Sequence, residues 1–309
     1  MDGTAAKGRH GVTKLVAMMV CRNEQWVLGC SARVALRWCD EIVILDHGST
    51  DATPDIISDL VREHPGRVHT IRLRATSGWV EQTHRQMAFA RARTKGATHF
   101  AIVDADEVPT GNMLEHGGAH LRRLITEITP VQYMAGLHEL CLWDSLDDWR
   151  VDGVFDTNRD IVVGFPDAPN LHWAPREDGY HLHARYPMFA RGISNPCPDW
   201  RGGGIMHLQF ASMRRHRAKN WWYRMVERIQ HPTKRTAEET NELYGWPFVG
   251  EPVLHRAPAH WWDGIPERRH IDLDLPPWHE QEIERLLAEH GPETFRGLYI
   301  GPYTERLAA

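Results

Sequence analysis

The sequence predicts an α/β protein built around a mostly parallel, Rossmann-like sheet. Through the first 110 residues, short apolar runs alternate with amphipathic stretches, which is the pattern of a β-α-β-α-β-α-β unit with short links. Each apolar run ends in polar or acidic residues, as expected where strands leave a buried sheet. Right-handed crossovers would then bring these strand ends to one edge of the sheet.

The first half of the chain supplies the strands and helices of this unit. Strands are predicted at residues 14–21, 41–45, 67–73 and 99–104, where apolar residues run together. Helices are predicted over residues 25–38, from Pro54 through Val61, and over residues 79–95, because apolar residues recur there at helical spacing.

The second half is less regular. We predict helices at 116–128, 211–230 and 280–290, a strand pair within 130–143, and a short strand or turn at 205–210. Residues 144–204 and 241–278 show no clean period and are predicted to be irregular. We therefore expect a disordered tail at 1–13, a main domain at 14–230 with halves at 14–110 and 111–230, and a Trp- and Pro-rich extension at 231–309.

Composition excludes several classes of protein. The net charge of −5 argues against a dedicated nucleic-acid partner. The five cysteines form no C-x-x-C pair, which argues against zinc. Their odd number is typical of reduced thiols in a cytosol. No run of about 18 apolar residues exists and residues 1–13 lack a signal core, so we expect a cytoplasmic protein without a membrane span.

Three acids follow the strand that ends this unit. Residues 99–103 are mostly apolar, and Asp104, Asp106 and Glu107 come directly after them. If the extended geometry continues, Asp104 and Asp106 point the same way. Paired carboxylates suit Mg²⁺ or Mn²⁺, which complete their shells with substrate phosphates. The sequence thus predicts a divalent-metal site for a diphosphate, and the alternative is a solvated acidic loop.

Three motifs at strand ends now form a recognisable set. They are Val20-Cys21-Arg22-Asn23-Glu24, Asp46-His47-Gly48-Ser49-Thr50-Asp51 and Val103-Asp104-Ala105-Asp106-Glu107. Because these motifs have this order and spacing, the chain resembles family 2-like glycosyltransferases with the GT-A fold. The likeness covers residues 14–110, and a weaker one covers 185–229, where His207-Leu208-Gln209-Phe210 precedes a basic helix.

The resemblance implies a metal site. Asp104 and Asp106 match the Asp-x-Asp motif, with Asp106 as the direct ligand and Asp104 nearer the ribose and metal. His207 would be a third ligand, although a histidine buried in the core is the alternative. Glu107 either caps a backbone turn or faces the acceptor.

The resemblance also implies a nucleotide site. The residues expected to bind the nucleotide are Arg22, Asn23, Glu24, Asp46, His47, Arg85 and Asp104. His47 departs from the family pattern, which has a second acid there that often contacts the base. Arg214, Arg215 and Lys219 either clamp the diphosphate or lie on a solvated helix face.

An inverting transfer needs a general base for the acceptor hydroxyl. We rank Asp199 first as the catalytic base because it lies shortly before His207, roughly where the family places an acceptor-side acid. The other candidates are Glu139, Asp144 and Asp178.

The resemblance therefore implies a glycosyltransferase that uses Mn²⁺ or Mg²⁺. It would move a sugar from a nucleotide-diphosphate sugar, with a UDP-sugar favoured. The lack of a membrane segment favours a soluble small-molecule acceptor. One alternative is a nucleotidyltransferase, which typically carries a Gly-rich basic loop that residues 22–31 lack. Another is a non-catalytic protein that binds sugar nucleotides.

Overall fold

The computed structural model describes residues 12–74, 79–129, 133–155, 160–174, 185–188, 190, 192–195, 202–245 and 250–307. The predicted tail at 1–13 lies outside these residues except for its last two, as do the candidate bases Asp178 and Asp199. Within the described parts of the chain, no helix is both long and apolar enough to cross a membrane.

The first half of the chain folds as predicted. Strands β1 to β4 alternate with helices α1 to α3, in the order β1 (Leu15–Cys21), α1 (Leu28–Trp38), β2 (Glu41–Asp46), α2 (Thr53–Glu63), β3 (Val68–Arg72), α3 (Glu81–Thr94) and β4 (His99–Ile102). The four strands pair in parallel in the order β3-β2-β1-β4. The predicted α/β class is therefore confirmed.

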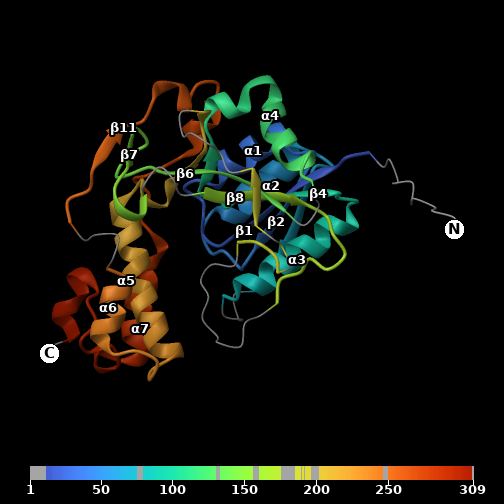
Figure 1. Cartoon of the computed structure of the whole chain (residues 1–309). Helices are drawn as coiled ribbons and strands as arrows, with labels where there is room; N and C mark the ends of the chain where they lie inside the picture. Colours follow the sequence, from blue (N-terminus) through green and yellow to red (C-terminus); the bar gives the residue numbers. More distant parts are fainter. Residues whose placement is uncertain are drawn as a thin grey trace, which may run out of the picture.

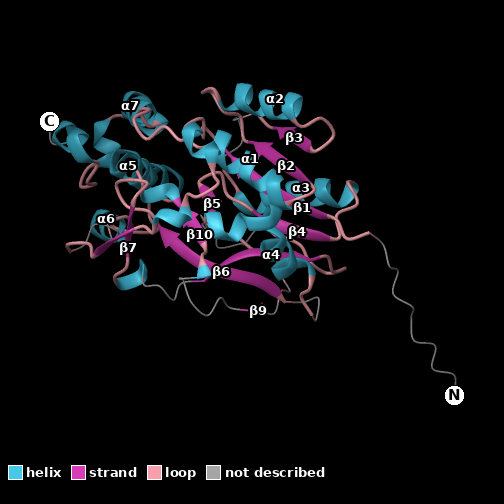
Figure 2. Cartoon of the chain, turned by 90° about the horizontal axis from the view of Figure 1, so that it is seen from above, coloured by secondary structure: helices cyan, strands magenta, loops and turns pink. Residues whose placement is uncertain are grey.

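The sheet continues beyond β4 with strands from residues 107–207 (Figure 2). These strands are β5 (Glu107–Pro109), β6 (Met134–Cys141), β8 (Asp160–Pro166), β9 (Ile193–Asn195) and β10 (Ile205–His207). The order is β4-β8-β6-β10-β5, with β9 also on β6, and β8 runs antiparallel to both of its neighbours. The sheet is thus mixed, with a parallel half that comes first in the chain.

Helices cover both faces of the sheet (Figure 1). Alternate residues of β1 point to opposite faces, as a pleated strand requires: Leu15, Ala17 and Met19 join one apolar core, and Val16, Met18 and Val20 join the other. The first core lies under α1, α2 and α4 (Glu115–Thr126), and the second lies under α3. Burial on both faces explains why these strands read as continuous apolar runs.

Two predictions for the second half are wrong. Residues 144–204 are predicted to be irregular, yet β8 and β9 lie there, because β4 and β6 offer edges with which these strands pair. The described part of 130–143 holds a single strand, β6, rather than a strand pair, because β6 pairs with β8, β9 and β10 from later in the chain. Every residue of β6 is buried, as expected for a central strand that is covered on both faces. The predicted helix at 116–128 is α4, although His116, Gly117 and Gly118 have positive φ and break its first turn.

The C-terminal helices gather beside the sheet (Figure 1). They are α5 (Met213–Gln230), α6 (Ala237–Leu243) and α7 (Trp278–His290), and a small β-ribbon pairs β7 (Asp148–Arg150) with β11 (Leu254–Arg256). Met225 of α5 shares an apolar cluster with Ile283 and Leu287 of α7. The intervening chain returns to the sheet, where Trp261 and Ile265 join its first core.

The position of β10 matters most for the site. It lies between β5 and β6, so His207 is in register with Glu107 on one side and with Cys141 on the other. The backbone N–H of Leu208 also donates to the carbonyl of Asp106 at 2.8 Å. A histidine one hundred residues away in the sequence is thereby fixed beside the acids that follow β4.

Candidate functional site

The chain turns immediately after β4. The N–H of Glu107 donates to the carbonyl of Asp104 at 3.1 Å, and β5 begins at Glu107. The extended geometry assumed for Asp104 and Asp106 therefore does not continue, and the two carboxylates meet different partners.

Two arginines hold Asp104. Arg85 Nη2 donates to Asp104 Oδ1 at 2.9 Å, and Arg185 Nη1 donates to Asp104 Oδ2 at 3.0 Å. Burial alone would raise the pKa of Asp104, but the two guanidinium groups outweigh it and hold that pKa well below its usual range. Arg85 is itself fixed by Glu81, whose Oε1 accepts from Arg85 Nε at 2.6 Å.

Glu107 completes this arginine-bound group. Arg185 Nη1 and Nη2 donate to its two oxygens at 2.6 and 2.7 Å, and Arg185 Nε donates to the carbonyl of Val162 at 2.6 Å. Glu107 Oε2 also accepts from the N–H of Asp104 at 3.1 Å, so Glu107 caps the turn. Burial raises the pKa of Glu107, against the pull of Arg185.

Asp106 faces His207 instead. Asp106 Oδ2 lies 3.6 Å from His207 Nε2, and His207 Nδ1 lies 2.6 Å from Glu139 Oε1. Burial alone would lower the pKa of His207, but the charge of Asp106 and hydrogen bonds raise it well above its ordinary value. Burial opposes the shift at Asp106 too, yet His207 lowers the pKa of that carboxyl.

Lys219 and Glu24 lie near Asp106. Burial alone would lower the pKa of Lys219, but Tyr223, Asp106 and Glu24 raise it. Burial, reinforced by the charge of Asp106, raises the pKa of Glu24 to about 8. Trp26 Nε1 donates to Glu24 Oε2 at 2.7 Å. Of the predicted cations on α5, Lys219 interacts with both of these acids, and Arg215 interacts with Glu24.

The other two cations predicted on α5 turn elsewhere. Arg214 forms a surface ion pair with Glu280 at 2.8 Å. Arg215 donates to the carbonyl of Leu275 at 2.8 Å and lies over the ring of Trp26 at 4.6 Å. These contacts give no support to the predicted role of Arg214 and Arg215 as a clamp for the diphosphate.

The strand-end residues of β1 and β2 bind one another. Asn23 has a φ of +56°, and its Oδ1 accepts from the N–H of Thr50 at 2.7 Å. Ser49 Oγ accepts from the N–H of Asn23 at 2.8 Å, and Asp46 Oδ1 accepts from the N–H of Ser49 at 2.9 Å. These contacts join the two strand ends into one loop structure.

His47 and Arg22 lie at the ends of the same two strands. His47 is fully buried, with its ring 4.5 Å from His84 and 5.4 Å from Trp79 between centroids. Arg22 reaches across to α7, where its guanidinium lies 5.1 Å from the ring of Trp278. Their roles toward a nucleotide stay predictions.

The side chains around Asp106 fit a divalent cation, and those around Asp104 do not. Two ligand atoms about 2.1 Å from one octahedral ion are about 3.0 Å apart, so the 3.6 Å between Asp106 Oδ2 and His207 Nε2 requires little movement. Oxygen and imidazole are both ligands for Mn²⁺. Both oxygens of Asp104, in contrast, already accept from arginines.

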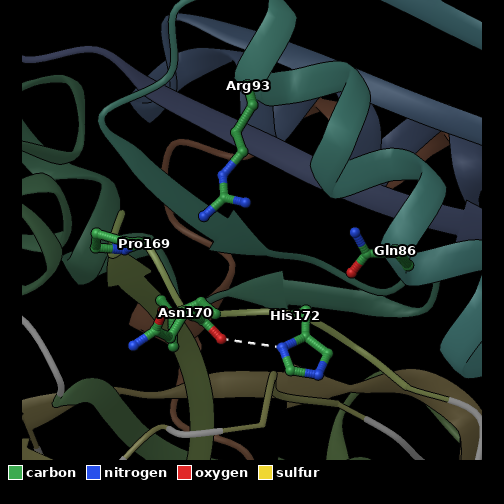
Figure 3. Close-up of a pocket in the computed structure, with 6 residues that line it drawn as sticks. Gln86, Arg93, Pro169, Asn170 and His172 are labelled. Carbon is green, nitrogen blue, oxygen red and sulfur yellow. Dashed lines mark hydrogen bonds between the residues drawn. The ribbon is translucent and has the colours of Figure 1, made fainter.

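A pocket of about 400 Å³ lies elsewhere, between α3 and the chain after β8 (Figure 3). It is lined by Gln86, Arg93, Pro169, Asn170, Leu171 and His172. Arg93 is neutralised by Asp167 at 2.6 Å, and Gln86 Oε1 accepts from the N–H of Trp173 at 2.8 Å. None of the predicted site residues lines this pocket, and its one charged lining residue, Arg93, is already paired.

Comparison with known proteins agrees with the strand-end motifs. Residues 16–126 match the sequence model of the family described as glycosyl transferase family 2. The resemblance to this family is confirmed over those residues. The matched segment runs from β1 through α4, so it contains Arg22, Asp46, Arg85, Asp104 and Asp106 and excludes His207. No curated protein matches the chain.

Solved structures give distant matches. One is S. aureus TarS 1–349, at 18% identity and a TM-score of 0.30, which covers 43% of this chain and 36% of that one. The same protein in complex with UDP matches at 16% identity and a TM-score of 0.30, over 42% of this chain and 36% of that one. The mannosyltransferase PcManGT from Pyrobaculum calidifontis, in complex with GDP-Man and Mn²⁺, matches at 12% identity and a TM-score of 0.40, over 89% of this chain and 75% of that one. The chain thus spans about a third of the TarS fragment.

Sequence reasoning missed Arg185 and the role of Glu139. Arg185 lies in a stretch without periodicity, and its partners Asp104 and Glu107 are about eighty residues away. Glu139 was a candidate base, yet its carboxylate is bound to His207. Glu139 and Cys141 are two residues apart on β6, so their side chains point to the same face, and β6 pairs with β10. This spacing is the signal that could have placed them beside His207.

Proposed function

We propose that this protein transfers a glycosyl group from a nucleoside-diphosphate sugar to an acceptor hydroxyl, and that it uses Mn²⁺ or Mg²⁺. The observation that carries the proposal is the facing pair Asp106 and His207, 3.6 Å apart at the end of β4. The family match over residues 16–126 supports the reaction class.

The metal would supply Lewis-acid stabilisation of the charge that develops on the leaving diphosphate. Asp106 and His207 would hold it, and Lys219 would add a fixed positive charge near the same diphosphate. Arg85 and Arg185 would keep Asp104 ionised and fixed in place, which suits a carboxylate that orients the donor ribose. Arg22, Asn23, Glu24, Asp46 and His47 remain our proposed nucleotide contacts.

We retain Asp199 as the proposed base for an inverting transfer, and Asp199 lies outside the described residues. Glu139 is less suited to that role, because its Oε1 is bound to His207 Nδ1 at 2.6 Å. Asp144 Oδ1 accepts from the N–H of Met213 at 3.3 Å at the start of α5. For the donor we favour a UDP-sugar, and for the acceptor a soluble small molecule.

Thermal melting with nucleoside diphosphates tests the proposal. UDP and GDP are added with and without Mn²⁺ to the wild type, to Asp106→Asn and to the control Asp263→Asn, a surface variant. Ligand at 100 times its dissociation constant stabilises a fold by about 2.7 kcal/mol. We expect a metal-dependent rise in Tm for the wild type and the control. Equal rises in Asp106→Asn would refute the assignment.

Release of free sugar from the donor separates the alternatives. A transferase hydrolyses its donor slowly in the presence of metal, whereas a non-catalytic binding protein leaves it intact. A nucleotidyltransferase would instead release pyrophosphate from a nucleoside triphosphate. Pyrophosphate release without donor hydrolysis would therefore replace our proposal with that alternative.

A further inference from the structure

A buried carboxylate lies behind His207. Glu139 is 6% exposed and sits on β6, the parallel neighbour of β10. Its Oε1 is 2.6 Å from His207 Nδ1, and Cys141 Sγ donates to the same oxygen at 3.8 Å. Because side chains alternate along a strand, Glu139 and Cys141 share the face of β6 that meets His207.

These three side chains resemble a metal site, but the distances argue otherwise. Their ligand atoms all lie within 4.8 Å of one another. Two ligands on one tetrahedral zinc ion are about 3.3 Å apart, since each lies about 2.0 to 2.1 Å from the metal. The 2.6 Å between Glu139 Oε1 and His207 Nδ1 is shorter than this and is the distance of a strong, charge-assisted hydrogen bond.

The two ring nitrogens of His207 therefore have different partners. Nδ1 is bound to Glu139 on β6, and Nε2 lies 3.6 Å from Asp106 after β4. With Nδ1 held as a donor to a carboxylate, the lone pair available for a metal is on Nε2. The ring cannot swing away from Asp106 without breaking the hydrogen bond between its Nδ1 and the buried carboxylate of Glu139, which is costly.

We propose that Glu139 is a positioning residue that aims His207 Nε2 at the metal shared with Asp106. The inference rests on the proposed function, because it concerns the cation assigned there. It adds a role that lies outside the matched family segment, since Glu139 follows residue 126. Loss of such a carboxylate typically weakens metal binding about 10- to 100-fold.

Mn²⁺ affinity of the full chain without donor tests this role. Free Mn²⁺ is measured by electron paramagnetic resonance for the wild type, Glu139→Gln and Glu139→Asp. Glu227→Gln is the matched control, since Glu227 is a 1% exposed carboxylate bound to Tyr244 and Arg235, on α5 and remote from His207. We expect the Kd for Mn²⁺ to rise about 10- to 100-fold in both Glu139 variants and to stay unchanged in the control.

Saturation with metal separates positioning from other roles. If Glu139 acts through the metal, excess Mn²⁺ restores most of the donor turnover of Glu139→Gln, whereas a lost general base leaves kcat low at any Mn²⁺ concentration. Folded Glu139 variants with wild-type Mn²⁺ affinity, or a low kcat that excess Mn²⁺ does not restore, would overturn the inference alone. A wild type that takes up no Mn²⁺ would overturn the proposed metal site and this inference together. Should Glu139→Gln fail to fold, Glu139→Asp keeps the charge and gives the same comparison.

Discussion

Asp104 and Asp106 are two residues apart, yet they lie in opposite settings. Asp104 is bound on both oxygens by arginines, which are permanent charges that donate in fixed directions. Asp106 faces a histidine, whose nitrogen can donate to a carboxylate or ligate a metal. The same sheet edge thus holds one carboxylate that arginines already bind and one that could share a cation with its histidine partner.

This difference bears on how the Asp-x-Asp motif would work in this chain. Under our proposal, the tight turn divides the motif into one acid for structure and orientation and one for the metal. The variants below test whether the division holds, from the largest expected effect to the smallest.

Asp106→Asn is expected to have the largest effect. It keeps the shape of the side chain and removes the charge that would hold the cation with His207. We predict a loss of donor turnover of about 1000-fold, equivalent to about 4 kcal/mol in the barrier. Steady-state kinetics at saturating Mn²⁺ measures this, and a loss below tenfold would contradict the division.

Arg185→Met tests the arginine-bound side. It leaves Glu107, which is 2% exposed, without its main cation. Removing one partner of a buried ion pair costs about 3 to 4 kcal/mol, so urea unfolding should show a loss of that size. The double variant with Glu107→Gln should recover part of it, because the uncompensated charge is gone. Additive losses in the double variant would show that Arg185 does not act through Glu107.

His84 has a third kind of environment, in which burial disfavours the protonated imidazole. Burial, with the neighbouring His47, lowers the pKa of His84 to about 4. The unfolded chain binds a proton at His84 near pH 6.5, so stability falls as pH drops from about 6.5 to about 4 and is flat below. We predict that His84→Gln reduces this loss by about 2 to 3 kcal/mol, measured by urea unfolding at each pH. The exposed control His260→Gln should retain the wild-type slope.

Asp104→Asn is expected to change metal binding least. It weakens the contacts to Arg85 and Arg185, which predicts a loss of about 1 to 2 kcal/mol in the free energy of unfolding. Because Asp106 and His207 remain, the Kd for Mn²⁺ should change by no more than about threefold, against the 10- to 100-fold expected when a positioning carboxylate is lost. A loss of Mn²⁺ binding equal to that of Asp106→Asn would make the two aspartates equivalent again.

Local pattern predicted the parallel half of the fold and the place of the acids. Strands such as Leu15–Cys21 are buried on both faces, which leaves a continuous apolar signal, and Asp104 and Asp106 follow the last of them directly. Resemblance to a family added His207. The partners from distant segments were not predictable in this way, because Glu139 reaches the site through strand order in the mixed half of the sheet, and Arg185 comes from a segment outside the strands. The turn at 104–107, which a backbone hydrogen bond and the Glu107 carboxylate close, also separates the two aspartates.

The most direct test is a crystal of the protein grown with Mn²⁺ and UDP, with an anomalous difference map recorded above the manganese absorption edge. The account predicts a peak within about 2.3 Å of both an Asp106 oxygen and His207 Nε2, with Asp104 still bound by Arg85 and Arg185. A peak coordinated by Asp104 in place of Asp106, or no peak with His207 turned away, would contradict it.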